Sequence, residues 1–575
     1  MSNSNQFDAI AIGSGIGGLT VAAILSKLNQ KKVLVLEQHY VAGGYTHEFA
    51  RESKFKWDVG LHYVGQMGKG EFGRKIFDYL TNGKLEWNKM PDQFEKFVYP
   101  DFTCEQSCDP IKFKADLIQM FPQEKQGIDR YFWDINAIAK MGTIPGFLKA
   151  LIQLFHPKLR NIERLTTKEY LDRNFQDPKL KAVLASQWGT YGLPPAQSSF
   201  AIHATVVSHF LKGGYYPVGG ASEIAKNILP LIEKNGGKVL TQKQVTEIII
   251  EDGIAKGVKV QKAHQPDSAI EEYYAPIVIS DAGAFNTYTK LIPSDNNLVA
   301  NYREEIKQFP KGNSVLTLFL GFKASPVKLG FKGENHWIYS DYDHDRTFQK
   351  QSVAPDKAID YCYMSFASLK DDTQTAHTAQ ILVFLGYEFF SKWQEQNWKH
   401  REAEYYQLKE AIAQNILNFV ESRYPGFKDL IEYYELSTPL TFAYFDASDR
   451  GAIYGIPCVP ERWGKKWLSA KTPIKNLYLT GMDVVSLGIM GATIGGITTA
   501  GVINGKFGFY NIMSAIFRES ASSNNNAKIK SKLLKEAQSL IQQLQHFKTE
   551  SRLYEFESLE TLEKMNTAQL EFWLI

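Results

Sequence analysis

The stretch DAIAIGSGIGG (8–18) decides the fold of this 575-residue chain. An apolar run typical of a buried strand leads into glycines at G-x-G-x-x-G spacing, and 19–28 then has the apolar pattern of a helix. Gly13 permits a tight turn, Gly15 lets the backbone approach a pyrophosphate, and Gly18 lets the helix pack closely on the strand. The free N–H groups at the start of such a helix favour an anion. These features predict a doubly wound α/β domain that binds a dinucleotide.

An acidic residue supports this interpretation. A second apolar run, 32–36, ends in Glu37, about twenty residues beyond the glycines, where a carboxylate accepts a hydrogen bond from a ribose hydroxyl and repels a 2′-phosphate. A glycine-rich turn that serves only packing is the alternative, and it leaves Glu37 unexplained.

The residues beyond Glu37 bear on the choice between NAD and FAD. Gly43 and Gly44 come first, and 55–65 reads FKWDVGLHYVG. Together these segments resemble the flavoprotein family of phytoene desaturases, carotenoid isomerases and retinol saturases, within the wider amine-oxidase-like group. The D-x-G-x-H-Y form is most similar to the retinol saturase and carotenoid isomerase branch. The resemblance implies FAD, with the glycine pair along its pyrophosphate. Many amine oxidases have arginine after this pair; Tyr45 here argues against a typical amine oxidase and leaves one phosphate contact open.

A segment near the far end resembles the second FAD motif of the same family. Residues 476–483 read NLYLTGMD, a buried strand followed by G-x-D, and a glycine-rich stretch comes next. The resemblance implies that Asp483 bonds the ribityl chain and that the backbone of 488–491 lies against the isoalloxazine. A buried capping aspartate is the alternative.

A third matching segment lies between these two. Residues 213–220 read GGYYPVGG, an amphipathic helix is expected over 221–234, and a hairpin over 247–260 turns at Glu-Asp-Gly. The segment resembles the YYPxGG helix of the family and the strand near the adenine, which implies that Val245 lies there. Together the three segments imply FAD contacts from Gly13, Gly15, Ile16, Gly17, Gly18, Glu37, Gly43, Gly44, Val245, Gly481, Asp483 and Gly491.

The three segments imply that one domain is built from distant parts of the chain. A Rossmann-type FAD-binding domain is expected over 1–70, 211–300 and 471–510. Residues 71–210 and 301–470 are expected to form a mixed-sheet α+β substrate domain, with strands at 314–322 and 381–387 covered by a helix at 405–419. After a polar linker, 511–575 is expected to be a helical C-terminal extension.

The bulk properties exclude several classes of protein. A net charge of +3 gives no electrostatic footprint for nucleic acid, and four scattered cysteines predict free thiols rather than a zinc site or a disulfide framework. No metal site is expected. The N-terminus has no signal-peptide pattern, which predicts a cytoplasmic protein. Residues 484–503 carry no charge, but their glycines favour a closely packed helix over a membrane span.

The family resemblance also implies the chemistry. Aromatic residues make up 13% of the chain, which fits an aromatic tunnel for a long apolar molecule or an ordinary core. The implied reaction is saturation or cis-trans isomerisation of a C=C bond in a polyene such as a carotenoid or retinoid, by hydride exchange at flavin N5. Desaturation in the oxidative direction, a non-catalytic FAD-containing lipid-binding protein and an amine oxidase remain alternatives. His62 and Tyr63 are the predicted catalytic residues nearest the ring, and a structural role for the histidine is the alternative.

Electron supply and membrane contact complete the expectations. No second strand followed by G-x-G-x-x-G is found, so NAD(P)H as an external reductant, or a redox partner, is expected to supply electrons. Residues 141–165 are apolar at helical spacing with basic flanks, which fits either peripheral contact with an anionic membrane or a surface helix over the core. The C-terminal helix is expected to dock on the body, a partner or a membrane.

Overall fold

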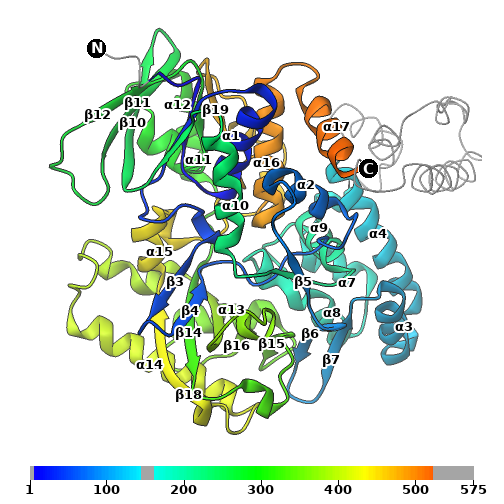
Figure 1. The fold of residues 1–575 in the computed structure, drawn as a ribbon. Helices are drawn as coiled ribbons and strands as arrows, with labels where there is room; N and C mark the ends of the chain where they lie inside the picture. The colour runs from blue at the N-terminus through cyan, green and yellow to red at the C-terminus, as the bar shows by residue number, and fades with distance from the viewer. Residues whose placement is uncertain (1–5, 144–160, 522–575) are drawn as a thin grey trace, which may run out of the picture.

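The computed structural model describes residues 6–143 and 161–521 (Figure 1). Most of the predicted membrane-contact segment 141–165, and the predicted C-terminal extension beyond residue 521, lie outside the described residues. The first part of that extension belongs to helix α17 (Gly508–Ala521), which packs against α2 (Phe72–Thr81) and α16 (Gly488–Ile503).

A five-stranded sheet forms the upper part of the molecule, and all its strand pairs are parallel. In spatial order the strands are β19 (Leu477–Leu479), β13 (Val278–Ser280), β1 (Ala9–Ile12), β2 (Val33–Leu36) and β9 (Lys238–Leu240). Short runs such as AIAI and VLVL form these strands because both faces of the sheet are buried. The sheet draws strands from both ends and the middle of the chain, which confirms a Rossmann-type domain assembled from discontinuous segments.

The two faces of this sheet are covered differently. Ala9 and Ala11 of β1 face a core shared with the helices α1 (Ile16–Asn29) and α10 (Ser222–Glu233), whereas Ile10 and Ile12 face the opposite core. On that second face lies an antiparallel sheet of β10 (Lys243–Glu251), β11 (Ile254–Lys262) and β12 (Glu271–Tyr274) instead of helices. The predicted hairpin is confirmed, since β10 and β11 pair on either side of the turn at 252–253.

A second, seven-stranded sheet forms the lower part (Figure 1). Its strands in order are β18 (Ile431–Ser437), β14 (Ser314–Phe322), β17 (His377–Leu385), β16 (Tyr361–Ser365), β15 (Asn335–Tyr339), β6 (Gln93–Val98) and β7 (Thr103–Ser107). Strands β15 and β6 are parallel and the other pairs are antiparallel, so the expected mixed sheet is confirmed.

Alternation along the central strands divides the sheet into two faces. Leu316 and Leu318 of β14 pack in the core beneath α14 (Ala403–Glu421), while Val315 and Thr317 point the other way. That other face is partly covered by the helices α4 (Lys125–Thr143), α8 (Pro178–Ala185) and α9 (Phe200–Phe210). The rest of it looks toward the five-stranded sheet, and this uncovered part becomes a wall of the cavity described below.

Shorter elements complete the fold. They are the hairpin of β3 (Glu48–Arg51) and β4 (Phe55–Asp58), the pair β5 (Trp87–Lys89) and β8 (Tyr215–Pro217), and the helices α3 (Pro110–Met120), α7 (Thr167–Asn174), α11 (Ala284–Asn286), α12 (Ala300–Gln308), α13 (His344–Val353) and α15 (Pro439–Asp446). All four cysteines are free, and three of them are buried.

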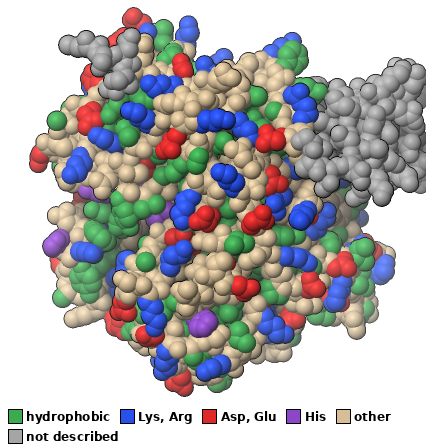
Figure 2. Space-filling view, in the orientation of Figure 1, with side chains coloured by type: hydrophobic (Ala, Val, Ile, Leu, Met, Phe, Trp, Pro, Cys, Tyr) green, Lys and Arg blue, Asp and Glu red, His purple; other side chains and the backbone are tan. Residues whose placement is uncertain are grey.

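The distribution of charged side chains on the surface agrees with the nearly balanced net charge of the chain. On the face shown in Figure 2, basic and acidic side chains are interspersed and neither sign forms a continuous field. The uncharged stretch at 484–503 mostly forms α16, which packs along α1. In the described part of the chain no helix has both the length and the apolar character needed to cross a bilayer.

Candidate cofactor and substrate site

One cavity of about 1300 Å³ lies between the two large sheets. At one end it is lined by the glycine-rich turns after β1 and β2, and at the other by aromatic side chains of the seven-stranded sheet. The structure brings twelve of the fourteen predicted site residues to its wall: Gly13, Gly15, Ile16, Gly17, Glu37, Gly43, Gly44, His62, Tyr63, Val245, Asp483 and Gly491. The other two, Gly18 and Gly481, lie behind the wall and allow close packing.

The glycine end of the cavity has the shape of a cradle that side chains would fill. A Cβ on Gly17 would stand 2.4 Å from the Cα of Gly481, and one on Gly44 would stand 2.9 Å from the Cα of Gly15. Gly43 has φ of +126°, a conformation that other residues avoid. At these positions the structure requires glycine for backbone shape, as a closely approached pyrophosphate also would.

Two helices begin at this end of the cavity. Helix α1 starts after Gly15 and α16 after Leu487, and neither N-cap makes a side-chain hydrogen bond within the described residues. One N–H of α1 is used internally, because Gly18 N donates to Asp281 Oδ2 at 2.9 Å. The remaining N–H groups of the first turns suit an anion, so the cradle fits a dinucleotide pyrophosphate.

Glu37 is buried at the end of β2, as the sequence predicts. Its Oε2 accepts from the backbone N and the hydroxyl of Ser14, at 2.8 and 2.6 Å, and its Oε1 accepts from His39 N at 2.7 Å. These bonds fix the carboxylate beside the glycine turn. Because each carboxylate oxygen has two lone pairs, Oε1 retains capacity for a ribose hydroxyl.

Asp483 has the capping role that its sequence context allows. Its Oδ1 accepts from Ile456 N at 2.9 Å and its Oδ2 from Ala284 N at 2.7 Å, so it ties together two loops on either side of the cavity. The buried Arg462 donates to the carbonyl oxygens of Met482 and Asp483 at 2.8 and 2.9 Å. Asp483 is therefore a structural capping residue that also lines the cavity.

A third carboxylate at this end was not predicted. Asp281 follows β13, and its Oδ2 would stand 2.5 Å from a Cβ on Gly15. Burial raises its pKa to about 7, with the nearby Glu37 and Asp483 adding to the effect. A negative charge here would oppose a pyrophosphate, and the raised pKa reduces that charge at neutral pH. In the sequence Asp281 directly follows the mostly apolar run 277–280, but nothing in one sequence places it under the glycines.

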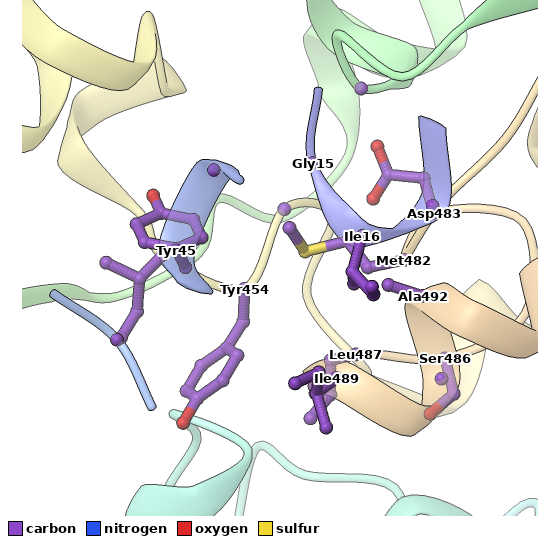
Figure 3. Close-up of a pocket in the computed structure, with 18 of the residues that line it drawn as sticks. Gly15, Ile16, Tyr45, Tyr454, Met482, Asp483, Ser486, Leu487, Ile489 and Ala492 are labelled. Carbon is purple, nitrogen blue, oxygen red and sulfur yellow. The ribbon is translucent and has the colours of Figure 1, made fainter. Parts of the chain in front are cut away.

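Apolar and aromatic side chains line the middle of the cavity. In Figure 3, Tyr45 and Tyr454 lie opposite Ile16, Met482, Leu487 and Ile489 across open space. The far wall comes from the uncovered face of the seven-stranded sheet. The side chains that it contributes to the cavity are Val315, Thr317, Trp337, Tyr363, Leu382 and Phe384. This end can hold an apolar molecule and exclude water from it.

His62 and Tyr63 are consecutive residues that both line the cavity. Burial lowers the pKa of His62 to about 3, aided by the positive charge of Lys370, so the imidazole is neutral at physiological pH. The Tyr63 ring stacks on Phe210, with centroids 4.2 Å apart. Its buried hydroxyl makes no hydrogen bond of ordinary geometry among the described residues.

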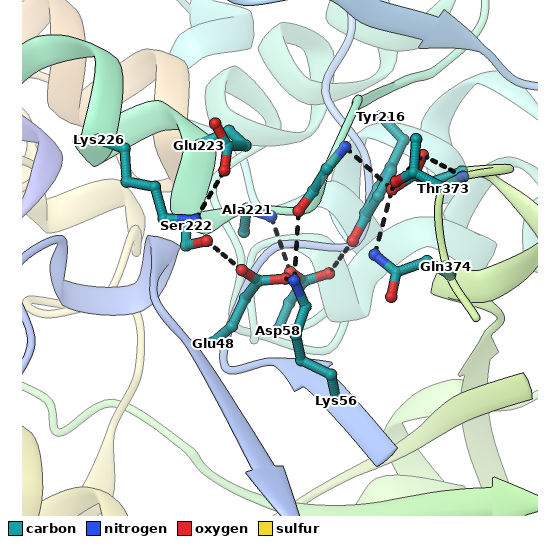
Figure 4. Close-up of polar contacts among 12 residues, drawn as sticks. Glu48, Lys56, Asp58, Tyr216, Ala221, Ser222, Glu223, Lys226, Thr373 and Gln374 are labelled. Atoms are coloured by element: carbon teal, nitrogen blue, oxygen red, sulfur yellow. Dashed lines mark hydrogen bonds and ion pairs between the residues drawn. The ribbon is translucent and has the colours of Figure 1, made fainter. Parts of the chain in front are cut away.

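The aspartate of the D-x-G-x-H-Y motif has a different task. Asp58 is buried outside the cavity wall and accepts from the hydroxyl of Tyr216 and from Ala221 N, the latter at 2.9 Å (Figure 4). Its own carbonyl accepts from Gln380 Nε2 at 2.9 Å. Burial raises its pKa to about 7. Asp58 thus anchors the segment 60–63 between the start of α10 and the second sheet.

Comparison with known proteins agrees with this geometry. Residues 12–80 match the family model for an NAD(P)-binding Rossmann-like domain. The chain is 36% identical over 537 residues to all-trans-retinol 13,14-reductase of Danio rerio, which covers 87% of this chain and 86% of that protein. The chain belongs to the retinol saturase and carotenoid isomerase family. Its predicted membership is therefore confirmed, and it is an oxidoreductase of the flavin type.

Two further likenesses place it within that group. Prolycopene isomerase 2, a chloroplastic protein of an Oncidium hybrid cultivar, is 28% identical to this saturase-family chain over 544 residues, covering 88% of the chain and 86% of that protein. The structure of putrescine oxidase bound to putrescine has a TM-score of 0.59 at 16% identity, covering 87% of this chain and 99% of that one. At such low identity the second likeness shows a shared fold alone.

Proposed function

We propose that the protein is an FAD-dependent oxidoreductase that saturates or isomerises a C=C bond of a long apolar polyene, such as a retinoid or carotenoid. The observation that carries this proposal is the single cavity with a glycine cradle at one end and an aromatic wall at the other. Its volume of about 1300 Å³ exceeds the roughly 300–1,000 Å³ usual for one small ligand. Two molecules, a cofactor and a substrate, therefore fit in one space.

The residues at the glycine end suit FAD. The N–H groups at the start of α1 would hold the pyrophosphate, Glu37 a ribose hydroxyl, and Asp483 the ribityl chain, while Val245 would line the adenine side. Bound FAD would supply a site that accepts or returns hydride at N5. The N-terminus of α16 would favour negative charge on the reduced ring.

The wall that the seven-stranded sheet gives to the aromatic end suits an uncharged substrate. No carboxylate from the seven-stranded sheet lines it in the described residues, and the lining side chains there are mostly apolar or aromatic. In the described structure the seven-stranded sheet contributes no carboxylate to pair with an amine cation, so this wall and Tyr45 argue against an amine oxidase despite the shared fold. The family relatives are named for retinol and prolycopene, both polyenes, which supports a polyene here.

Electrons for saturation must come from a separate donor. We infer that NAD(P)H acts directly at the flavin or that a redox partner does so, because one strand followed by G-x-G-x-x-G is present and it is used for the flavin. A cytoplasmic location with peripheral membrane contact stays a prediction.

An absorption spectrum of the full-length protein, purified with its bound small molecules, tests the proposal. We expect flavin bands that dithionite bleaches. Under anaerobic conditions, saturation of added all-trans-retinol would restore these bands, whereas isomerisation of added prolycopene would change the polyene and leave the flavin reduced. A protein that neither carries nor takes up FAD contradicts the cofactor assignment. A flavin that stays reduced, with every added polyene recovered unchanged, favours a non-catalytic lipid-binding protein. Formation of new double bonds by the oxidised protein would favour a desaturase.

A further inference from the structure

The cavity has an opening to solvent that carries two lysines. Lys290 and Pro310 are both exposed, and both line the cavity together with Lys311, so the interior reaches the surface here. The Nζ atoms of Lys290 and Lys311 lie 5.6 and 4.9 Å from the centre of the Phe285 ring, which lines the cavity as well. Two positive charges therefore converge on one ring at the opening. We call Phe285, Lys290 and Lys311 the lysine mouth.

One carboxylate lies close to the lysine mouth. Asp449 Oδ2 is 3.5 Å from Lys311 Nζ, whereas Lys290 makes no hydrogen bond or ion pair with any described residue. Partial burial lowers the pKa of Lys290 and the charge of Asp449 acts in the opposite direction, so this ammonium group lacks a counter-ion that fully replaces water. The other acid of this segment, Asp446, interacts with Glu37 instead. The lysine mouth thus retains positive charge.

Hydrogen bonds hold the backbone around the lysine mouth. Arg303 of α12 donates to five carbonyl oxygens between residues 288 and 296, at 2.7 to 3.1 Å. On the other side of the opening, Asn286 Nδ2 donates to the carbonyl oxygen of Ala447 at 3.0 Å. Because the backbone on both sides is already ordered, a ligand that binds here need not order it.

A strip of cavity-lining residues leads from the lysine mouth toward the aromatic wall. Lys311 and Gly312 directly precede β14, and Val315 and Thr317 of β14 line the same cavity. The polypeptide from residue 311 to residue 317 spans at most about 20 Å. A long molecule can therefore keep one end at the lysines while its chain lies along β14.

We propose that the lysine mouth binds a carboxylate at one end of the substrate, so that the substrate is an amphipathic polyene rather than a pure hydrocarbon. This inference rests on the proposed function and names the substrate class within it. Two ammonium groups and the Asp449 carboxylate leave one net positive charge at the opening. A single carboxylate on the ligand balances that charge.

The donors at the lysine mouth suit a carboxylate better than other end groups. An ammonium group can donate three hydrogen bonds, and neither Lys290 nor Lys311 donates one to a described residue. The two oxygens of a carboxylate can accept from both lysines at once, in charge-assisted bonds. A hydroxyl end gains no such attraction, and both lysines repel an amine.

A charged end also gives the substrate a register along the cavity. Apolar contacts such as those with Val315 are non-directional, so they do not fix how far a uniform chain slides along β14. A carboxylate held at the lysine mouth fixes one end of the chain. The position of each double bond along the cavity then follows from its distance to that end. Lys290 and Lys311 are therefore specificity-determining residues that act far from the reacting bond along the chain.

Equilibrium binding to the oxidised, FAD-loaded, full-length protein tests the proposal without turnover. All-trans-retinoate and all-trans-retinol share one chain and differ in the end group, and each is titrated at pH 7 while quenching of tryptophan fluorescence is followed. We expect wild type to bind retinoate about tenfold more tightly than retinol. Lys290→Gln and Lys311→Gln should each weaken retinoate binding by about fivefold, the upper range for a partly exposed ion pair. Retinol affinity and flavin content should stay unchanged.

The chain offers a matched control for these two variants. Lys212 also lines the cavity, is exposed and makes no hydrogen bond or ion pair with a described residue, but it belongs to the segment after α9. Lys212→Gln should change retinoate affinity by less than about twofold. Lys311→Arg keeps the charge and should bind retinoate like wild type. Asp449→Asn removes the competing carboxylate and should strengthen retinoate binding by about threefold, with retinol unaffected.

The outcomes separate this inference from the proposed function. Equal affinities of wild type for retinoate and retinol, or equal weakening of both ligands in the lysine variants, would overturn the carboxylate site. Loss of flavin from Lys290→Gln or Lys311→Gln would assign these lysines to the phosphates of FAD and overturn it too. If retinoate binds through the lysines but the reduced protein leaves every added polyene unchanged, the lysine mouth stands and the proposed function is contradicted.

Discussion

The two ends of the cavity are built from different parts of the polypeptide. The cofactor end is shaped by backbone, where glycines touch one another and a Cβ at Gly17 would collide with the Cα of Gly481. The aromatic end is shaped by side chains that alternate outward from strands, such as Trp337 and Phe384. Backbone shape tolerates no added atom, whereas a side-chain wall changes its contour with each substitution. The cofactor should therefore be fixed across variants, and the substrate should be adjustable.

The largest effect is expected from Gly17→Ala at the backbone-built end. The added methyl would stand 2.4 Å from the Gly481 Cα and 2.7 Å from Asp281 Oδ1, so β19, α1 and α16 must shift. Overpacking of this kind costs about 3 kcal/mol, which thermal unfolding and flavin content measure together. Gly386→Ala is the control: its new Cβ would meet the flexible carboxylate of Glu388 and nothing else closer than 3.9 Å. Equal stability of the two variants would contradict the claim that the backbone-built end tolerates no added atom.

Removing the ribose acceptor comes next. Glu37→Ala should weaken FAD binding by about 2 kcal/mol, because a charge-assisted hydrogen bond is lost. Titration of flavin-free protein with FAD at a temperature where both forms are folded gives the value. Glu432→Ala removes an exposed carboxylate paired with Lys54 and should leave the affinity unchanged. Unaltered affinity of Glu37→Ala would mean that Glu37 only orders the turn around Ser14.

A smaller, pH-dependent effect is expected at Asp281. Its pKa is raised to about 7, so the group is neutral below that pH and charged above it. A charged Asp281 repels the pyrophosphate, and FAD affinity should fall as pH rises through 7. Above pH 8, Asp281→Asn should bind FAD roughly fivefold more tightly than wild type, about 1 kcal/mol.

The same raised pKa affects stability. The contribution of neutral Asp281 is fully present below about pH 4, the pKa of an exposed aspartate, and is lost as pH rises through about 7. Flavin-free Asp281→Asn should therefore lose less stability than wild type between pH 4 and 7. If FAD affinity and stability depend on pH in the same way in wild type and in Asp281→Asn, the claim that Asp281 is neutral below about pH 7 is contradicted.

The smallest effect belongs to the side-chain wall. Phe384→Leu keeps the surface apolar but removes ring contacts with Trp188 and Tyr454, at 5.8 and 6.2 Å between centroids. Polyene affinity should fall by only about 0.5 kcal/mol, with a change in the preferred chain length and no change in flavin content. Loss of flavin from this variant would show that the two ends are not independent.

The sequence predicted the backbone-built end well, because its signals are local. Strand, glycines and helix are contiguous in 8–28, and Glu37 closes the next strand. The family resemblance extended this to Asp483 and Val245, which the structure brings to the same cavity. On the second face of the domain, a three-stranded sheet takes the place of the helices of an ordinary doubly wound fold. The predicted hairpin forms two of its strands, β10 and β11.

The side-chain end could not be predicted in the same way. Asn335 bridges Lys370 and Glu95, which are 275 residues apart in sequence. The parallel pairing of β6 with β15 that places Asn335 beside Glu95 is a non-local event with no local signal. In the sequence Glu95 is one acid in an amphipathic strand and Lys370 one lysine before a loop. The position of Asp281 could not be predicted either, because only the packing of β13 places it beneath the glycines.

The most direct test of the central claim is the mass of the product from one anaerobic turnover. The FAD-loaded, reduced protein is mixed with one equivalent of all-trans-retinol, and product and flavin are analysed together. We expect a product heavier by two hydrogens and an equal amount of oxidised flavin. Retinol recovered unchanged beside a fully reduced flavin, with prolycopene behaving alike, would contradict it.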